Sequence, residues 1–345
     1  MASISNLVLP PLSLLYRAVT QARTTAYEKG LFQICRLNAP VISVGNLTVG
    51  GTGKTPFVEW LSRVLAEQGK RVCVLTRGYG RDNPATRVLV SDGSKILADA
   101  AEAGDEPLLL AQNLKGLAAV ISDADRAAAG KWASKQLGCE VFILDDGFQH
   151  LRLARDLNMV LIDATNPWGG GHLLPYGRLR EPRSALSRAD CIVLTRAEKN
   201  RDVESLKQEI RRFNQTSPIF SSTMNVKTVS QLGSAVQEDL TTVLQRIGGF
   251  CGIANPQAFF DQLSDAGFQS VLNKPFSDHH WYTQSEIDSF CWKAKEFGAQ
   301  ALITTAKDAV KLLPLNFDLP CYVLHIEVSI ECEAELRRVI NKAIP

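Results

Sequence analysis

The sequence predicts an α/β fold made of two units of unequal size. Its 345 residues exceed the length of one typical domain. Short β-rich runs alternate with helical stretches, which implies a mainly parallel sheet covered by helices on both faces. This alternation stops near residue 220 and then begins again. We therefore expect a larger unit over residues 35–219, a linker over 220–230 and a smaller α/β unit over 231–345.

The larger unit begins with a strand over residues 41–44, followed by a helix over 55–68. Apolar residues recur on one face of this helix, and Gly69 gives it a stop signal. Pro56 is tolerated because it falls in the first turn. Further strands are expected at residues 71–76, 120–122, 140–144, 159–163 and 191–195.

The smaller unit follows an extended connector, SPIFSSTMNVKTVS, at residues 217–230, which is rich in Ser and Thr and has short β-prone pieces. Strands and helices alternate again after it, at a smaller scale. Strands are expected at 243–250, 270–272, 301–304 and 321–326, and helices from Pro256, from Gln284 and over 306–312.

Composition excludes several classes of protein. Hydrophobic residues make up 45% of the chain and charged residues 21%, which is the balance of a soluble globular protein. A net charge of +2 without a run of Lys and Arg gives no indication of nucleic-acid binding. The eight cysteines form no C-x-x-C pair, and several lie in apolar runs. We expect them to be reduced and buried in a cytosolic protein.

The N-terminal segment, residues 1–34, is predicted to contain an amphipathic helix. Residues 7–16 lack a basic region and a cleavage site, and they fall short of the ~20 apolar residues that cross a bilayer. Residues 14–32 mix apolar and basic side chains, as does a helix lying in a lipid headgroup layer. A terminal helix packed on its own domain shows the same pattern, so the residues alone leave both interpretations open.

The strongest chemical signal is GNLTVGGTGKTP at residues 45–56, between a predicted strand and a predicted helix. The glycines permit a tight turn with inward N–H groups, the lysine supplies a cation, and the threonine offers a hydroxyl to Mg²⁺. Thr48 stands where the usual motif has its first glycine. We expect phosphate contacts from Thr48, Val49, Gly50, Gly51, Thr52, Gly53, Lys54 and Thr55.

Two adjacent acids, Asp145 and Asp146, end the hydrophobic strand at 140–144. Ligands of parallel sheets bind at the carboxyl ends of the strands, so a carboxylate here is placed to serve Mg²⁺. Because neighbouring side chains of an extended chain point to opposite sides, we expect at most one of the two to approach the metal.

Other polar clusters fall at the predicted strand ends and loops. Each cluster could also have a purely structural role. Arg77 could lie in a surface turn, Asp105 could cap a helix, Arg126 and Arg178 could be solvated surface charges, and DDGFQH could be an ordinary hydrogen-bonded turn. Asp278-His279-His280 lacks a third spaced ligand, which makes zinc a weak hypothesis and acid–base or orienting chemistry the better one. The functional candidates are Arg77, Asp105, Glu106, Arg126, Gln149, His150, Arg178 and His279.

Six motifs in order carry a family resemblance: GNLTVGGTGKTP, RGYG, GDEP, DDGFQH, PYGRLREP and DHH. Together they resemble the tetraacyldisaccharide 4'-kinases, the lipid A kinases of Gram-negative bacteria. The resemblance implies ATP- and Mg²⁺-dependent phosphorylation of the 4'-hydroxyl of a tetraacylated glucosamine disaccharide 1-phosphate. It also implies a P-loop NTPase-type domain joined by a β connector to a smaller Rossmann-like domain. Because the substrate is a lipid, it favours peripheral association of residues 1–34 with the cytoplasmic face of the inner membrane, and we expect a monomer.

The resemblance assigns roles residue by residue. Asp105 matches the proposed general base and His279 its partner, while Lys54 matches the phosphate-loop lysine. Since Asp105 and His279 fall in different units, we hypothesise that this pair assembles when the units close on substrate. Members of the family usually have Glu in place of Ala306, so no nucleotide contact is assigned to that loop. The implied metal side comprises Thr55, Asp145, Asp146 and Glu106, and the implied substrate or phosphate side comprises Arg77, Arg126, Gln149, His150 and Arg178.

Two alternatives come from other classes. A regulatory or metallochaperone GTPase would have a similar glycine-rich loop, but neither residues 195–198 nor residues 305–308 match the guanine-reading N/T-K-x-D motif. A non-enzymatic membrane-associated module could hold a structural nucleotide, but it would have no use for acids and a histidine at strand ends. GTP-against-ATP competition and acceptor-dependent ADP release separate these alternatives from the kinase.

Overall fold

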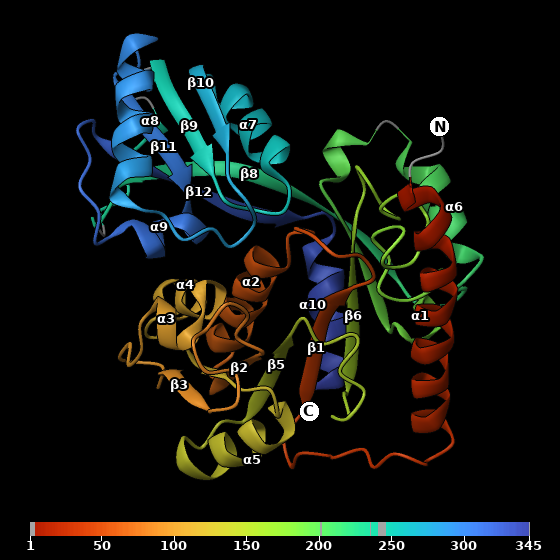
Figure 1. The fold of residues 1–345 in the computed structure, drawn as a ribbon. Coiled ribbons are helices and arrows are strands. Elements are labelled where there is room, and N and C mark those ends of the chain that lie inside the picture. The colour runs from red at the N-terminus through yellow and green to blue at the C-terminus, as the bar shows by residue number, and fades with distance from the viewer. Residues whose placement is uncertain (1–3, 201, 235, 241–245, 345) are drawn as a thin grey trace.

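The computed structural model describes residues 4–200, 202–234, 236–240 and 246–344. Within these residues the strands join into a single 12-stranded sheet in the order β10-β9-β11-β12-β8-β7-β6-β1-β5-β2-β4-β3 (Figure 1). The predicted α/β class is therefore confirmed. The strands are β1 (Val41–Asn46), β2 (Val72–Thr76), β3 (Val88–Ser91), β4 (Ala118–Ser122), β5 (Val141–Asp145), β6 (Leu157–Asp163), β7 (Cys191–Thr195), β8 (Ile219–Gln231), β9 (Arg246–Cys251), β10 (Gln269–Pro275), β11 (Ala301–Thr305) and β12 (Cys321–Ile330).

Helices cover this sheet, and most of them lie near their predicted positions. The sequence prediction did not include β3, α3, α5, α6 or α10, and the first residues of the strand predicted at 243–250 lie outside the described residues. The helices are α1 (Ile4–Glu28), α2 (Lys54–Glu67), α3 (Ala100–Ala103), α4 (Asp105–Asn113), α5 (Arg126–Gln136), α6 (Val203–Arg211), α7 (Pro256–Asp265), α8 (Gln284–Glu296), α9 (Ala306–Leu312) and α10 (Glu333–Ala343), with 3₁₀ turns at Arg183–Arg188 and Ala197–Lys199.

The first half of the sheet positions the phosphate loop. Its central strands β1 and β5 are parallel and buried, and β1 lies between β5 and β6. Helix α2 starts directly after the loop and buries Phe57, Leu61 and Leu65 against the sheet. Burying each such side chain contributes about 1.5–3 kcal/mol. This packing holds the N-terminus of α2, and with it the loop, at the carboxyl edge of the sheet.

The second half is joined to the first through β8. This strand pairs in parallel with β7 at its start and antiparallel with β12 along its remaining length. The extended connector predicted at 217–230 is thus a strand of the sheet. Strands β9, β10, β11 and β12 form the second half, which lies above the carboxyl edge of the first in Figure 1.

The last helix, α10, returns to the first half and packs on α2. Leu336 and Ile340 are fully buried in the same core cluster as Phe57. Arg337 forms an ion pair of 3.2 Å with Glu67 at the end of α2. The predicted domain limits stay a prediction. The structure shows in addition that residues 333–343, which follow the smaller unit in the chain, pack against the larger unit.

Helix α1 runs along one side of the molecule (Figure 1) and presents its apolar side chains outward. Leu14, Leu15 and Val19 are 66%, 63% and 60% exposed. The inward face is polar, and the Ser13 hydroxyl donates to the carbonyl oxygen of Leu173 at 2.6 Å. The helix begins at residue 4, ten residues before the predicted start, and includes two prolines in its first half. Among the described residues, none of the helices has the length and apolar content needed to cross a membrane.

Candidate active site

The phosphate loop lies between β1 and α2 and is held from within by one buried side chain. The amide nitrogen of Asn46 donates to the carbonyl oxygen of Thr48 at 2.8 Å and to the hydroxyl of Thr52 at 2.9 Å. Gly50 and Gly53 have φ values of 117° and 77°, a region that residues with a side chain rarely adopt. The backbone conformation of the turn therefore requires glycine at positions 50 and 53.

Two neighbouring segments support this turn from outside. The N–H of Val49 donates to the carbonyl oxygen of Arg178 at 2.8 Å. At the end of β7, the hydroxyl of Thr195 donates to the carbonyl oxygen of Thr52 at 3.0 Å. Arg196 donates to another loop carbonyl at 2.7 Å and forms a buried ion pair with a carboxylate at the end of β6. These contacts use the N–H of Val49, and their other partners in the loop are carbonyl oxygens.

Lys54 and Arg180 converge on Asp146. The Lys54 ammonium lies 3.4 Å from Asp146 Oδ1, and Arg180 Nη1 lies 2.7 Å from Asp146 Oδ2. Burial alone would raise the pKa of Asp146, but the two cations outweigh burial and hold it well below its usual range. Asp146 is therefore ionised and neutralised locally by the two groups best placed to bind phosphate.

Asp145 has the opposite electrostatic character. Burial, followed by the negative charges of Glu106 and Asp146, raises the pKa of Asp145 to about 7. The expectation that at most one of the two acids approaches the metal stays a prediction, but its premise of an extended backbone is wrong. Asp146 leaves the strand with φ 50°, a left-handed conformation, so both carboxylates line the same cavity.

Asp105 and His279 come together from the two halves of the sheet. His279 Nδ1 lies 2.9 Å from Asp105 Oδ2 and 3.0 Å from Oδ1. Gly104 is the N-cap of α4 and Asp105 its first helical residue, so the N-cap alternative is wrong. The hydrogen bond with Asp105 raises the pKa of His279. Burial alone would raise the pKa of Asp105, but the bond from His279 and nearby lysines lower it to about 2.

Two lysines of α9 complete this region, and neither was singled out from the sequence. Lys307 Nζ lies 2.9 Å from Glu106, 3.2 Å from Asp278 and 3.2 Å from His279 Nε2. Burial would lower the pKa of Lys307, but the surrounding carboxylates raise it above its usual range. Lys311 contacts Asp105 from the other side, at 3.2 Å.

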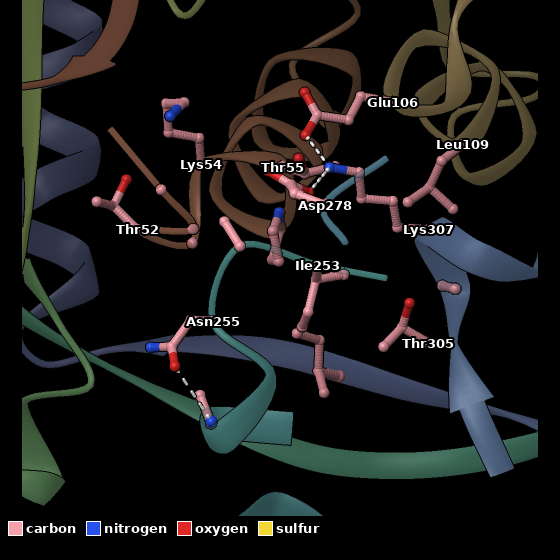
Figure 2. A pocket seen from close by; sticks show the side chains of 18 of the residues that line it. Thr52, Lys54, Thr55, Glu106, Leu109, Ile253, Asn255, Asp278, Thr305 and Lys307 are labelled. Carbon is pink, nitrogen blue, oxygen red and sulfur yellow. Dashed lines mark hydrogen bonds and ion pairs between the residues drawn. The ribbon is translucent and has the colours of Figure 1, made fainter. Parts of the chain in front are cut away.

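A cavity of about 520 Å³ lies between the two halves, and we call it the nucleotide cavity (Figure 2). Its lining includes Lys54, Asp145, Asp146, Arg180, His279 and Lys307, whereas Asp105 and Lys311 are buried outside that lining. Figure 2 shows Lys54 and Thr52 of the phosphate loop on one side and Ile253, Asn255 and Thr305 of the second half on the other. Ala306, to which no nucleotide contact was assigned, also lines it. The cavity is long enough to pass from the loop to both α7 and α9.

A second cavity, of about 490 Å³, lies between the inward face of α1 and the first half of the sheet, and we call it the acceptor cavity. Tyr16, Thr20 and Arg23 of α1 form one wall. The two cavities share five residues, and so adjoin at the phosphate loop. The shared residues are Val49, Arg77, Tyr79, Asp146 and Arg180.

The floor of the acceptor cavity holds an arginine–histidine pair. Arg126 Nη2 lies 2.9 Å from His150 Nδ1. Burial, together with the charges of Arg126 and Arg155, lowers the pKa of His150 to about 3, so its ring is neutral. A neutral ring that accepts from Arg126 at Nδ1 carries its proton on Nε2, and this buried nitrogen has no hydrogen-bond partner among the described residues. The pair therefore places a neutral imidazole beside a guanidinium in the wall of the cavity.

The remaining predicted residues lie around the junction of the cavities. Arg77 donates to the Tyr79 hydroxyl at 2.8 Å. The Gln149 amide donates to the carbonyl oxygen of Asn46, at the start of the phosphate loop, at 3.0 Å. The guanidinium of Arg178 instead packs over Gly50, where a β-carbon would collide with it. The roles of these residues, and of the metal-side set, stay predictions.

Comparison with known proteins decides the family. A family model described as "Tetraacyldisaccharide-1-P 4'-kinase" matches residues 5–345. The chain belongs to this family.

Curated relatives cover nearly the whole chain. A "Tetraacyldisaccharide 4'-kinase" of Geobacter metallireducens is 43% identical over 339 residues, covering 98% of each protein. A protein of the same name from Geobacter sulfurreducens is 41% identical over 345 residues, covering 99% of this chain and 95% of the relative. Among solved structures, the "apo" form of LpxK from Aquifex aeolicus in complex with ATP matches with a TM-score of 0.79 and 33% identity, covering 99% of this chain and 100% of that one. The family prediction from the six motifs is confirmed.

The site residues that sequence reasoning missed are those that contact other elements of the fold. Arg180 lies in the recognised PYGRLREP motif, but nothing local distinguishes it from Arg178. Arg196, Lys307 and Lys311 are single basic residues in ordinary strand-end or helix settings. Their partners are distant in sequence, so only the tertiary arrangement reveals them.

Proposed function

We infer that this kinase transfers the γ-phosphoryl group of ATP to the 4'-hydroxyl of tetraacyldisaccharide 1-phosphate. The observation that carries this proposal is the junction of the two cavities at the phosphate loop, where Asp146 and Arg180 line both. A nucleotide with its phosphates in one cavity and a sugar hydroxyl in the other would meet there. The family and its curated relatives supply the identity of the acceptor.

ATP is the proposed donor, held by the loop N–H groups, Lys54 and Arg180. A helix N-terminus preceded by glycines attracts phosphate through its free N–H groups and its positive dipole end. The Aquifex relative was solved with ATP. The base and ribose would extend toward Asn255, whose side chain caps α7 by accepting from the N–H of Ala258.

Mg²⁺ is the proposed metal, and the donor set suits it. Thr55, Glu106, Asp145 and Asp146 offer only oxygen ligands, and all four line the nucleotide cavity. Burial, followed by the charges of Glu106 and Asp146, raises the pKa of Asp145, and a bound cation would stabilise its ionised form. No three His, Cys, Asp or Glu side chains of the described residues gather into a metal cluster. Bound Mg²⁺ would neutralise charge on the phosphate oxygens.

Catalysis would rest on positioning and on cations around the transferring group. Lys54 and Arg180 stand where negative charge of the γ-phosphate would gather. As the oxygen–phosphorus bond forms, the acceptor hydroxyl would lose its proton to Asp105, with His279 orienting that carboxylate. The hypothesis that Asp105 and His279 meet on closure stays a prediction; the structure has them in contact.

The acceptor cavity is proposed to hold the anionic disaccharide. Arg23, Arg77 and Arg126 line it, and the acidic side chains among its described lining residues, Asp146 and Glu181, are both ion-paired. Guanidinium groups bind phosphate with charge-assisted hydrogen bonds.

Residues 1–34 are proposed to bring the enzyme to the cytoplasmic face of the inner membrane. Helix α1 has an apolar outer face and a polar inner face, the reverse of a helix packed on its own core. Such a helix buries its apolar face in the interfacial region of a bilayer. The acyl chains of a substrate held under α1 would then remain in the membrane.

The test is transfer of label from γ-labelled ATP to a defined lipid. Purified protein is incubated with Mg²⁺ and a panel of acylated glucosamine disaccharides, with and without a 1-phosphate. We expect label in the tetraacylated 1-phosphate and loss of at least about 10³-fold in Lys54→Ala, because the cation on the transferring group is removed. Labelled inorganic phosphate with no labelled lipid would refute the proposed acceptor.

A further inference from the structure

Lys311 is one of the most deeply buried charged groups of the molecule. Its side chain is 1% exposed, and that of Asp105 is 4% exposed. Lys311 comes from α9 in the second half and reaches the carboxylate at the start of α4 in the first half, with Nζ 3.2 Å from Oδ2. A buried ammonium is tolerated only when it is paired, so this contact has a purpose beyond filling space.

The other partner of Lys311 is Asp308, one turn earlier on α9. Its Oδ1 lies 3.6 Å from Lys311 Nζ, and its side chain is fully buried. Asp308 is itself fixed, because its Oδ2 accepts from the N–H of Gly252 at 3.0 Å and from the hydroxyl of Thr305 at 2.7 Å. Through Asp308, Lys311 is held in place by the end of β11 and by the residue that follows β9, and its ammonium contacts the first half.

The contacts around Asp105 surround its carboxylate. Glu106 N donates to Oδ1 at 2.8 Å, His279 Nδ1 spans both oxygens, and Lys311 donates to Oδ2. His279 is in turn held at Nε2 by Lys307. With donors on both oxygens from three directions, the carboxylate has one orientation, and Lys311 shares Oδ2 with His279.

We propose that Lys311 is a positioning residue for phosphoryl transfer, which fixes the carboxylate of Asp105 from the second half of the molecule. The inference rests on the proposed function of Asp105 as the proton acceptor. Lys311 acts through Asp105 and does not touch the acceptor or the nucleotide. It therefore supports the rate of transfer and not the affinity for ATP.

The experiment is a double-mutant cycle of kcat at saturating ATP and lipid acceptor. Lys311→Met removes the charge and keeps an unbranched chain. We expect kcat to fall roughly 10–100-fold, the range typical of partners that orient a functional side chain, with the KM for ATP within about twofold. In an Asp105→Asn background, the same change should alter kcat by less than about twofold, because the group that Lys311 positions is already lost.

A purely structural role would give a different pattern. If Lys311 only stabilised the fold, Lys311→Met would lower kcat by the same factor in the wild-type and Asp105→Asn backgrounds, and that result overturns the inference. An unchanged kcat in Lys311→Met overturns it as well. If Lys311→Met does not fold, the double variant Lys311→Met with Asp308→Asn is used, because it removes one buried charge of each sign. We expect this double variant to lower kcat by the same factor, and to lower it by less than about twofold in the Asp105→Asn background. If Asp105→Asn alone leaves kcat unchanged, it is the proposed role of Asp105 that fails.

Discussion

The nucleotide and acceptor cavities adjoin but are built in contrasting ways. The nucleotide cavity takes residues from both halves of the sheet and is rich in carboxylates, whose pKa values are driven apart, to about 7 for Asp145 and to below the usual range for Asp146. The described residues that line the acceptor cavity come from the first half and α1, and arginine is prominent among them. We therefore expect transfer chemistry to depend on the contact between the two halves, and acceptor binding to be independent of it.

The sharpest test of this contrast is His279→Ala, which removes a second-half group from the nucleotide side. We expect kcat to fall by roughly 10²–10⁴, the usual contribution of a positioned acid–base group. The KM for the lipid acceptor should stay within about threefold, since His279 does not line the acceptor cavity. Steady-state kinetics with each substrate varied in turn checks both, and an unchanged kcat at saturation would remove His279 from the mechanism.

Arg126→Gln tests the acceptor side. Loss of a charge-assisted contact costs about 1.5–3 kcal/mol, so the acceptor KM should rise roughly 10–100-fold while the KM for ATP stays the same. Arg71→Gln is the matched control, because Arg71 is exposed, forms an ion pair with Glu140 and is not among the described lining residues of either cavity. Equal changes in both KM values would mean that the cavities do not act separately.

The outer face of α1 extends the acceptor side toward the membrane. Leu15→Ser with Val19→Ser should lower binding to phospholipid vesicles about tenfold or more, since each apolar side chain contributes about 1.5–3 kcal/mol when buried. Transfer to a detergent-dispersed acceptor should be unaffected. Vesicle flotation measures the first effect, and Thr25→Ala, on an exposed residue of the same helix, serves as the control. Unchanged flotation would place membrane contact elsewhere.

The smallest expected effect concerns Glu59, a carboxyl of α2 that lines the nucleotide cavity. Burial raises its pKa to about 7, although Asn113 donates to it at 2.8 Å. Because its folded-state pKa lies above the unfolded value, ionisation destabilises the fold as pH rises from about 4.5 to about 7, and this loss persists above pH 7.

Glu59→Gln keeps the contact with Asn113 and removes the ionisation. We expect it to raise the free energy of unfolding by about 1 kcal/mol at pH 8 and to have almost no effect at pH 4.5. Urea denaturation at the two pH values, in Mg²⁺-free buffer, measures the difference. An equal gain at both would show that Glu59 is not ionised by pH 8, or that solvent reaches it freely.

Features that depend on interactions between residues close in the sequence could be predicted, and features that depend on distant residues could not. The phosphate loop, the strand ending at Asp145 and most of the strands and helices depend on local periodicity and turn chemistry, and they were predicted, whereas β3, α3, α5, α6 and α10 were not. The left-handed turn at Asp146 was not, because nothing local requires it of an aspartate. Arg180 and Lys311 act on partners supplied by the folded chain, and α10 packs on a helix about 270 residues earlier. Such long-range contacts leave no local signal.

The continuity of the sheet through β8 and β12 has a mechanical consequence. Because the two halves share backbone hydrogen bonds along these strands, one half can turn relative to the other only by changing the twist of the ribbon between them. A flexible linker would allow the halves to separate with little change in free energy. A two-stranded ribbon has a preferred twist, so it favours one relative orientation of the two halves. The ribbon thus favours the relative orientation in which groups from opposite halves, such as Asp105 and His279, are in contact.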